Sequence, residues 1–159
     1  QGMTCSLPVL EYAKELHTNE DKTYRALALS NLIAIHQKTG IGRLSAYCGA
    51  VSAGAAAGAG IAYLCGGGYE EVIHTVVNAL AIVSGMVCDG AKASCAAKIA
   101  ASVDAGILGY NMYLQGQQFY AGDGIITKGI EGTIDNVGRL GKDGMKETNE
   151  EIIRIMIND

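Results

Sequence analysis

The residues of this sequence best suited to chemistry are three cysteines in two short segments. Cys88 and Cys95 lie in CDGAKASC, and Cys48 lies upstream in SAYCG. In a continuous helix, two residues seven apart are separated by roughly 10.5 Å of axial rise, too far to share one small metal centre. Asp89-Gly90 is a strong helix breaker, so we expect a turn that lets the two sulfurs converge.

Residue types alone leave the role of these thiols open. They could form a metal site, with Lys92 offsetting the negative charge that thiolate ligands bring. They could equally be small buried thiols, because free cysteine packs like a small hydrophobe. Zinc at the same three cysteines is a third alternative. Asp89 is expected to form the turn, or else to lie beside the site as an acid.

The two segments resemble the cysteine motifs of a known family. Residues 42–50 (GRLSAYCGA) and 88–96 (CDGAKASCA) are similar to motifs of the L-cysteine desulfidases, which are related to the alpha chain of oxygen-sensitive, iron–sulfur L-serine dehydratases. The resemblance runs from Gln1 to the segment 150–156, and it covers only the last part of a typical family member.

This resemblance implies a cofactor and a reaction. The three cysteines that bind the iron–sulfur cluster in the family correspond to Cys48, Cys88 and Cys95. A [4Fe–4S] cluster normally takes four thiolates, so three would leave one iron open as a Lewis acid. The implied reaction is α,β-elimination from L-cysteine or L-serine, giving pyruvate, ammonia and sulfide or water. Arg43, within the motif, and Lys38 are predicted to bind the substrate carboxylate. The general base is expected upstream of this chain, so no catalytic residue is assigned here.

The other two cysteines and the histidines are predicted to be structural. Cys65 follows Cys48 by 17 residues at the far end of the same expected helix, about 25 Å away. Cys5 lies on the entry segment. The histidines are His17, His36 and His74.

Composition limits the class of protein. The 159 residues are expected to form one domain, 1–159, large enough for a real core. Hydrophobic residues make up 49% and charged residues 18%, below the usual quarter, which indicates surface buried in a homo-oligomer or against further sequence. The net charge is 12 − 16 = −4 without a basic run, which argues against a nucleic-acid partner. The sequence has no Lys/Arg-rich amphipathic helix of the kind that binds a membrane surface.

The number of cysteines bears on the compartment. Five cysteines, an odd number, favour the reducing cytoplasm over a secreted disulfide scaffold.

The first residues predict a separated domain. Gln1-Gly2-Met3 resembles the tail of a Gly-rich S-G-N-Q-G-type motif of the family, so the chain is expected to be the C-terminal part of a longer lyase. It would be inactive until its N-terminal domain is supplied. A vector remnant before a true start at Met3 is the competing explanation. The alternative function is a metal-free helical packing or oligomerisation module.

The elements expected to position the cysteines are all helical, and no strand is expected. Six or seven helices should pack around one that is rich in Ala and Gly. Residues 44–69 carry no charge and are long enough to span a bilayer, but with so few large apolar residues they fit a central helix of a soluble core better. Cys48 should lie near the N-terminal end of that helix, where the helix dipole stabilises a thiolate. The helices are expected at about residues 8–16, 18–40, 44–65, 70–87, 91–114, 125–137 and 148–157.

Overall fold

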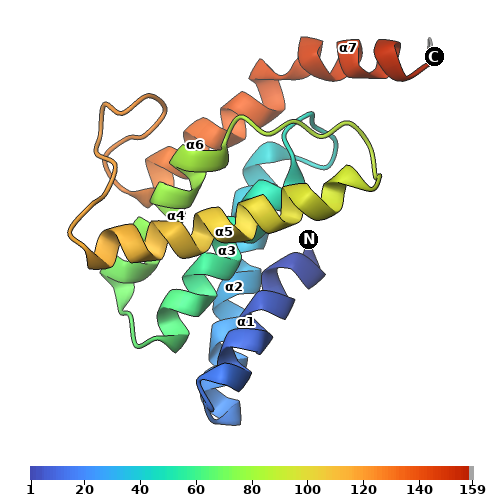
Figure 1. The fold of residues 1–159 in the computed structure, drawn as a ribbon. Coiled ribbons are helices and arrows are strands. Elements are labelled where there is room, and N and C mark those ends of the chain that lie inside the picture. The colour runs from blue at the N-terminus through green and yellow to red at the C-terminus, as the bar shows by residue number, and fades with distance from the viewer. Residues whose placement is uncertain (158–159) are drawn as a thin grey trace.

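The protein is an all-α bundle, as the sequence predicts. The structure, a computed structural model, describes residues 1–157 (Figure 1). Within them, one isolated antiparallel β-bridge, Tyr47 to Val87, joins two extended segments. The helices are α1 Gly2–Glu15, α2 Glu20–Ile41, α3 Gly49–Leu64, α4 Tyr69–Val83, α5 Ser94–Leu114, α6 Ile130–Arg139, a π-helical turn η1 Leu140–Gly144 and α7 Lys146–Ile157.

Helix α3 is the centre of the bundle, which confirms the prediction for the Ala/Gly-rich segment. Thirteen of its 16 residues are buried, and it packs against α1, α2, α4 and α5. The crossing with α5 depends on glycine, because a Cβ at Gly58 would lie 2.6 Å from the Cα of Gly106. Real Cβ atoms do not approach backbone so closely, so the two helix axes can come together only without these side chains. No helix within residues 1–157 combines the length and apolarity needed to cross a membrane.

Helix α1 begins earlier than predicted. It starts at Gly2 and contains Pro8, which was expected to open the helix. Cys5, Val9 and Ala13 recur every four residues and are buried, so they form one face toward the core. That burial outweighs the hydrogen bond that a proline inside a helix removes.

Two later helix starts also differ from prediction. Helix α6 begins at Ile130 instead of residue 125, because Gly129 precedes it with a φ of 86° and the segment before it is a loop. Helix α7 begins at Lys146, so Thr148 lies within the helix and caps nothing. No residue of α7 is buried, and the helix projects from the bundle beyond η1 (Figure 1).

The ends of α2 and α4 matter most for the cysteines. Asn19 caps α2, close to the predicted start at residue 18, and accepts the Lys22 N–H at 2.9 Å. The helix runs to Ile41 and stops at Gly42, whose φ is 89°. Helix α4 was expected to continue to residue 87 but ends at Val83. After a turn at Ser84 and Gly85, residues 86–88 pair with the segment that enters α3.

Candidate functional site

The N-terminal end of α3 brings two of the predicted cysteines together. Cys48 is the N-cap residue of α3. Its N–H donates to the Met86 carbonyl at 3.1 Å, and the Cys88 N–H donates to the Ala46 carbonyl at 2.6 Å. The two cysteine segments, forty residues apart in sequence, are therefore hydrogen-bonded to each other.

This pairing places Cys48 and Cys88 on the same face. Side chains alternate along an extended segment, so both cysteines lie opposite the side taken by the bridged Tyr47 and Val87. Diagonal neighbours in such a pair are roughly 7–8 Å apart. Cys48 is buried and belongs to the main core cluster, while Cys88 is half-buried and packs against that cluster. Both are free thiols.

Cys95, in the first turn of α5, is tied to the loop that follows Cys88. Its Sγ donates to the Gly90 carbonyl at 3.3 Å and lies 3.5 Å from the backbone N of Lys92. Gly90 has a φ of 96°, a turn conformation that suits glycine, so the expected break between the two cysteines is confirmed. Cys95 is half-buried and free.

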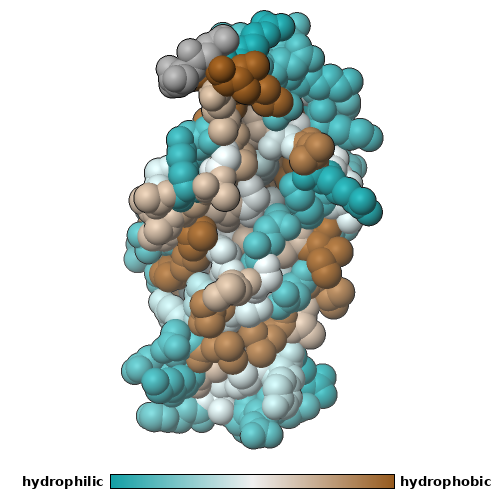
Figure 2. All heavy atoms as spheres, turned by 90° about the vertical axis from the view of Figure 1, so that its right-hand side faces the viewer, coloured by the Kyte–Doolittle hydropathy of each residue, from teal (hydrophilic) through white to brown (hydrophobic). Residues whose placement is uncertain are grey.

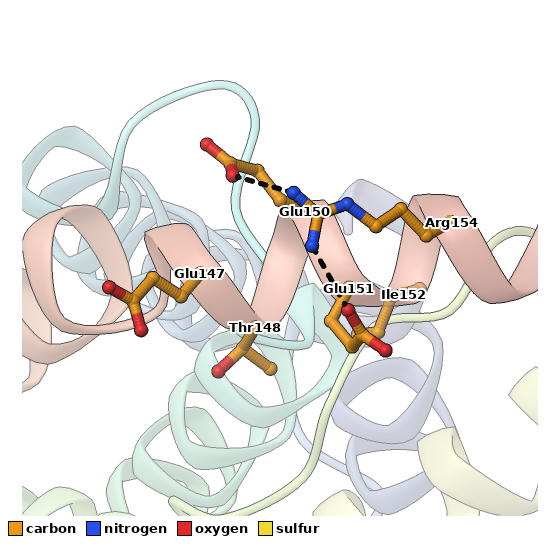
Figure 3. A pocket seen from close by; sticks show the side chains of 6 residues that line it. All are labelled: Glu147, Thr148, Glu150, Glu151, Ile152 and Arg154. Atoms are coloured by element: carbon orange, nitrogen blue, oxygen red, sulfur yellow. Dashed lines mark hydrogen bonds and ion pairs between the residues drawn. The ribbon is translucent and has the colours of Figure 1, made fainter.

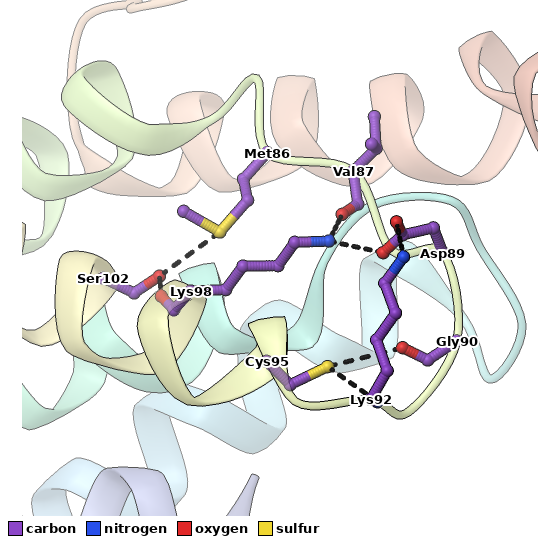
Figure 4. Close-up of polar contacts among 8 residues, drawn as sticks. All are labelled: Met86, Val87, Asp89, Gly90, Lys92, Cys95, Lys98 and Ser102. Carbon is purple, nitrogen blue, oxygen red and sulfur yellow. Dashed lines mark hydrogen bonds and ion pairs between the residues drawn. The ribbon is translucent and has the colours of Figure 1, made fainter.

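The same loop carries a cluster of opposite charges, shown in Figure 4. Asp89 uses one carboxylate oxygen for Lys92 and the other for Lys98, each at 2.5 Å. Hydrogen bonds from Lys92 and Lys98 lower the pKa of Asp89 to about 2. The hydrogen bond to Asp89 likewise raises the pKa of Lys98, and the charges of Cys48 and Cys95 raise it further. A protonated lysine thus stands beside two of the predicted ligands.

Ser45 and Tyr47, which lie just before Cys48, fix the segment that leads into α3. The Ser45 hydroxyl donates to the Gly141 carbonyl and accepts the Tyr47 N–H at 2.9 Å, which ties this segment to η1. Tyr47 is 1% exposed, and its hydroxyl has no hydrogen-bond partner among residues 1–157. Burial raises the pKa of Tyr47 far above its usual range, and the neighbouring Cys48 adds to this effect.

The two predicted carboxylate-binding residues share a surface hollow. Lys38 and Arg43 line a space of about 390 Å³ together with Gln1, Thr39 and two neighbours. Neither cation forms an ion pair with any residue that the structure describes. The side-chain amide of Gln1 reaches the Gly49 carbonyl at 3.4 Å, so this hollow adjoins the first residue of α3 after Cys48.

The remaining cysteines and histidines lie elsewhere. Cys65 is the C-cap residue of α3, at the opposite end from Cys48. Cys5 is buried, and its Sγ bonds to the Asn31 side chain at 3.4 Å. His36 pairs with Glu131 across α2 and α6 at 2.7 Å. His17 follows the end of α1 and has a φ of 51°, and His74 stacks on Tyr113 with ring centroids 4.7 Å apart.

A larger hollow of about 640 Å³ lies along α7 and does not involve the thiols (Figure 3). It is lined by one helix, and three of the six lining residues are glutamates. Its one cation, Arg154, already pairs with Glu150 and Glu151. It offers no group that the predicted chemistry needs.

Sequence reasoning missed Lys98 and the segment pairing. Lys98 lies three residues after Cys95 in a helix, a spacing that puts both on one face and could have indicated it. As the side chains stand, residues 1–157 contain no group of three His, Cys, Asp or Glu side chains able to hold a metal ion. The three thiols are thus gathered at one end of the bundle without converging on a single point.

Relatives of the chain are longer than the chain itself. A UPF0597 protein of Desulfitobacterium hafniense is 71% identical over 158 residues, which are 99% of this chain and 37% of that protein. A UPF0597 protein of Lachnoclostridium phytofermentans is 60% identical over 99% of this chain and 38% of its own length. One of Treponema denticola is 52% identical over 100% of this chain and 37% of its own. The chain thus spans a little over a third of the length of these curated relatives.

No solved structure matches the chain. Residues 1–154 match the family described as serine dehydratase alpha chain. That match covers all three cysteines and both cations of the hollow beside α3. The chain belongs to the serine dehydratase alpha chain family.

Proposed function

We propose that this chain supplies the [4Fe–4S] site of an amino-acid lyase, with Cys48, Cys88 and Cys95 as the protein ligands. One observation carries the proposal: the segments bearing Cys48 and Cys88 are hydrogen-bonded to each other, and Cys95 bonds to the loop that joins it to Cys88. In a serine dehydratase alpha chain, three free thiols so gathered are the natural candidates for ligands.

The donor set fits a cluster. Thiolates are the ligands of iron–sulfur clusters, and each of three cysteines can bind a different iron atom, so their sulfurs need not converge on one point. That suits three free thiols that do not form a group of three ligands for a single ion in the described residues. When bound with three protein thiolates, a cluster supplies one open iron that acts as a Lewis acid toward the leaving group.

The residues of the chain have separate tasks in the proposed reaction. Arg43 and Lys38 bind the carboxylate of the substrate, since both cations are free of ion pairs with described residues and share one hollow. Lys98 holds positive charge beside the thiolates. The substrate, L-cysteine or L-serine, loses its α-proton and its β-substituent as hydrosulfide or hydroxide. The resulting aminoacrylate takes up water to give pyruvate and ammonia. The group that accepts the α-proton is proposed to lie upstream of this chain.

A second domain is part of the proposal. Because the relatives are much longer than this chain, we expect an N-terminal domain to complete the substrate site, and the 159 residues alone to be inactive. Apolar side chains are available for that contact or for a homo-oligomer: Leu44 is 93% and Met3 73% exposed. Figure 2 shows several apolar patches between polar side chains on one face. Five free thiols agree with a reducing compartment, which we propose is the cytoplasm.

The alternative is a metal-free helical packing module. One observation favours it, namely that the described residues form no ready group of three metal ligands. In that case the thiols would serve only as small packing residues, and no iron would bind.

The activity of the full-length protein, with the proposed N-terminal domain included, distinguishes the two functions. Prepared without oxygen and supplied with iron and sulfide, it is expected to release pyruvate from L-serine or L-cysteine, with sulfide appearing only from L-cysteine. Cys48→Ser should abolish the release, whereas Cys65→Ser, at the other end of α3, should retain it. Pyruvate release by the Cys48→Ser variant at the wild-type rate would contradict the proposal.

A further inference from the structure

The side chain of Lys98 joins the helix that carries Cys95 to the residues on either side of Cys88. Its Nζ donates to the Val87 carbonyl at 2.9 Å and to the Asp89 carboxylate at 2.5 Å (Figure 4). An ammonium has three donors, so two of them are used here. Only 20% of the side chain is exposed, which is low for a lysine.

These contacts fix Cys88 from two directions. Lys98 holds the residue before Cys88 and the residue after it, and both contacts come from α5. From the segment that precedes α3, the Ala46 carbonyl accepts the N–H of Cys88 at 2.6 Å, two residues before Cys48. The residues around Cys88 are therefore hydrogen-bonded both to α5, which carries Cys95, and to the segment that carries Cys48.

The turn of α5 that bears Lys98 is itself anchored in the core. Ser102 is fully buried, and its hydroxyl donates to the Lys98 carbonyl at 2.7 Å. It also lies 3.9 Å from the Met86 sulfur. A Cβ at Gly54 of α3 would collide with Ser102. The Lys98 side chain thus starts from a rigid base.

Lys92 provides a natural comparison. It also pairs with Asp89, at 2.5 Å, but its side chain is 50% exposed and it has no hydrogen bond to Val87. Lys92 lies on the loop itself, before α5 begins at Ser94. It can stiffen the loop but cannot fix the loop against α5.

We propose that Lys98 is a positioning residue that sets Cys88 relative to Cys95 and Cys48. The proposal deepens the proposed function, because it concerns the arrangement of the three thiols that would hold the cluster. The contacts themselves exist without a cluster, so the two ideas can fail separately.

Alkylation of the metal-free, intact protein by iodoacetamide tests the proposal, with each cysteine followed by peptide mass spectrometry. Lys98→Met keeps an unbranched stem and removes the ammonium. It should raise the alkylation rate of Cys88 about tenfold, because two charge-assisted hydrogen bonds around it are lost. Cys5 and Cys48, which are 1% and 7% exposed, should stay protected and report that the fold is intact.

Three further variants complete the experiment. Lys92→Met should change the Cys88 rate by less than about twofold, since an exposed ion pair contributes little. Lys98→Arg retains the charge and the donors, and should restore most of the protection. Asp89→Asn removes the shared carboxylate without touching α5, so it tests the same contact if Lys98→Met does not fold, and it should also raise the Cys88 rate.

The outcomes are distinct. Equal Cys88 rates in Lys98→Met and Lys92→Met, or no increase in Asp89→Asn, would overturn the positioning role. A second readout follows anaerobic addition of iron and sulfide, where Lys98→Met should alter the visible absorption spectrum per iron while Lys92→Met should not. If the wild type binds no iron, the proposed function fails, and the Cys88 rates still decide the role of Lys98.

Discussion

The two ends of α3 carry the same residue type in opposite settings. Cys48 caps the N-terminal end, where another segment pairs with it and a protonated lysine stands nearby. Cys65 caps the C-terminal end, roughly 25 Å away along the helix, and Lys22 is the cation whose charge acts on it. The helix dipole favours a thiolate at the first end and disfavours it at the second.

Their local chemistry differs accordingly. Cys65 is an exposed residue, yet partial burial of its sulfur raises the pKa of its thiol, against the opposing effects of a hydrogen bond with Tyr110 and the charge of Lys22. Cys48 is buried in the main core cluster, and its segment is hydrogen-bonded to the segment that carries Cys88. A cysteine therefore becomes a candidate ligand through the segments that meet at it, and exposure alone is a poor guide.

The largest expected effect on stability comes from disturbing the close packing of α3, the helix that joins the two cysteine ends, against α5. Gly58→Ala places a Cβ 2.6 Å from the Gly106 backbone, so α3 and α5 must move apart. We expect a loss of about 3 kcal/mol in the free energy of unfolding. Urea denaturation measures it. Gly85→Ala, where nothing lies within 4 Å, is the control and should change stability by less than about 0.5 kcal/mol. Equal losses in both variants would show that the close crossing does not matter.

A smaller effect should be confined to the cysteine end. Gly90→Ala forces a side chain into a φ of 96°, which costs about 1–2 kcal/mol. Hydrogen exchange should accelerate in residues 86–92 and stay unchanged near Cys65. Faster exchange throughout α3 would mean that the two ends are not independent.

A variant of Tyr47 tests whether its buried hydroxyl, next to Cys48 in the sequence, contributes a hydrogen bond. Tyr47→Phe removes a buried hydroxyl that has no partner in the part of the chain that the structure describes. Thermal unfolding should show unchanged stability or a gain of up to about 1 kcal/mol, because no hydrogen bond is lost. A clear loss of stability would mean that the hydroxyl has a partner in solution.

The smallest effect concerns Cys65 itself. Because its pKa is raised and the thiolate is the reactive form, Cys65 should react more slowly than a cysteine in a short peptide at pH 8. The rate should still be rising at pH 10, where the peptide thiol, with a pKa of about 8.5, has nearly levelled off. Rates from pH 7 to 10, read by mass spectrometry, check this. A Cys65 rate equal to that of the peptide at pH 8 would contradict the raised pKa.

Much of the fold could be predicted because it depends on periodicity and residue size. The Ala/Gly-rich run predicts a helix packed on all sides, and a second helix is predicted to begin at about residue 18; both are confirmed, the second with its start at Glu20. Pro8 misled the prediction of α1, since the burial of one face of that helix is decided by its partners. The start of α6 depends on the positive φ of Gly129, which sequence alone did not reveal.

The candidate site was predictable only in part. The motifs identified the three cysteines, and the break at Gly90 followed from its residue type. The pairing of residues 46–48 with 86–88 could not be predicted, because three residues are too few to show strand alternation. The roles of Arg43 and Lys38 stay predictions.

The most direct measurement is the iron and sulfide content of the intact protein after anaerobic reconstitution. About four iron and four sulfide per chain are expected in the wild type, in Cys65→Ser and in Cys5→Ser. Cys48→Ser, Cys88→Ser and Cys95→Ser should each lose most of that content. Full iron and sulfide in any one of these three variants, or none in the wild type, would contradict the account.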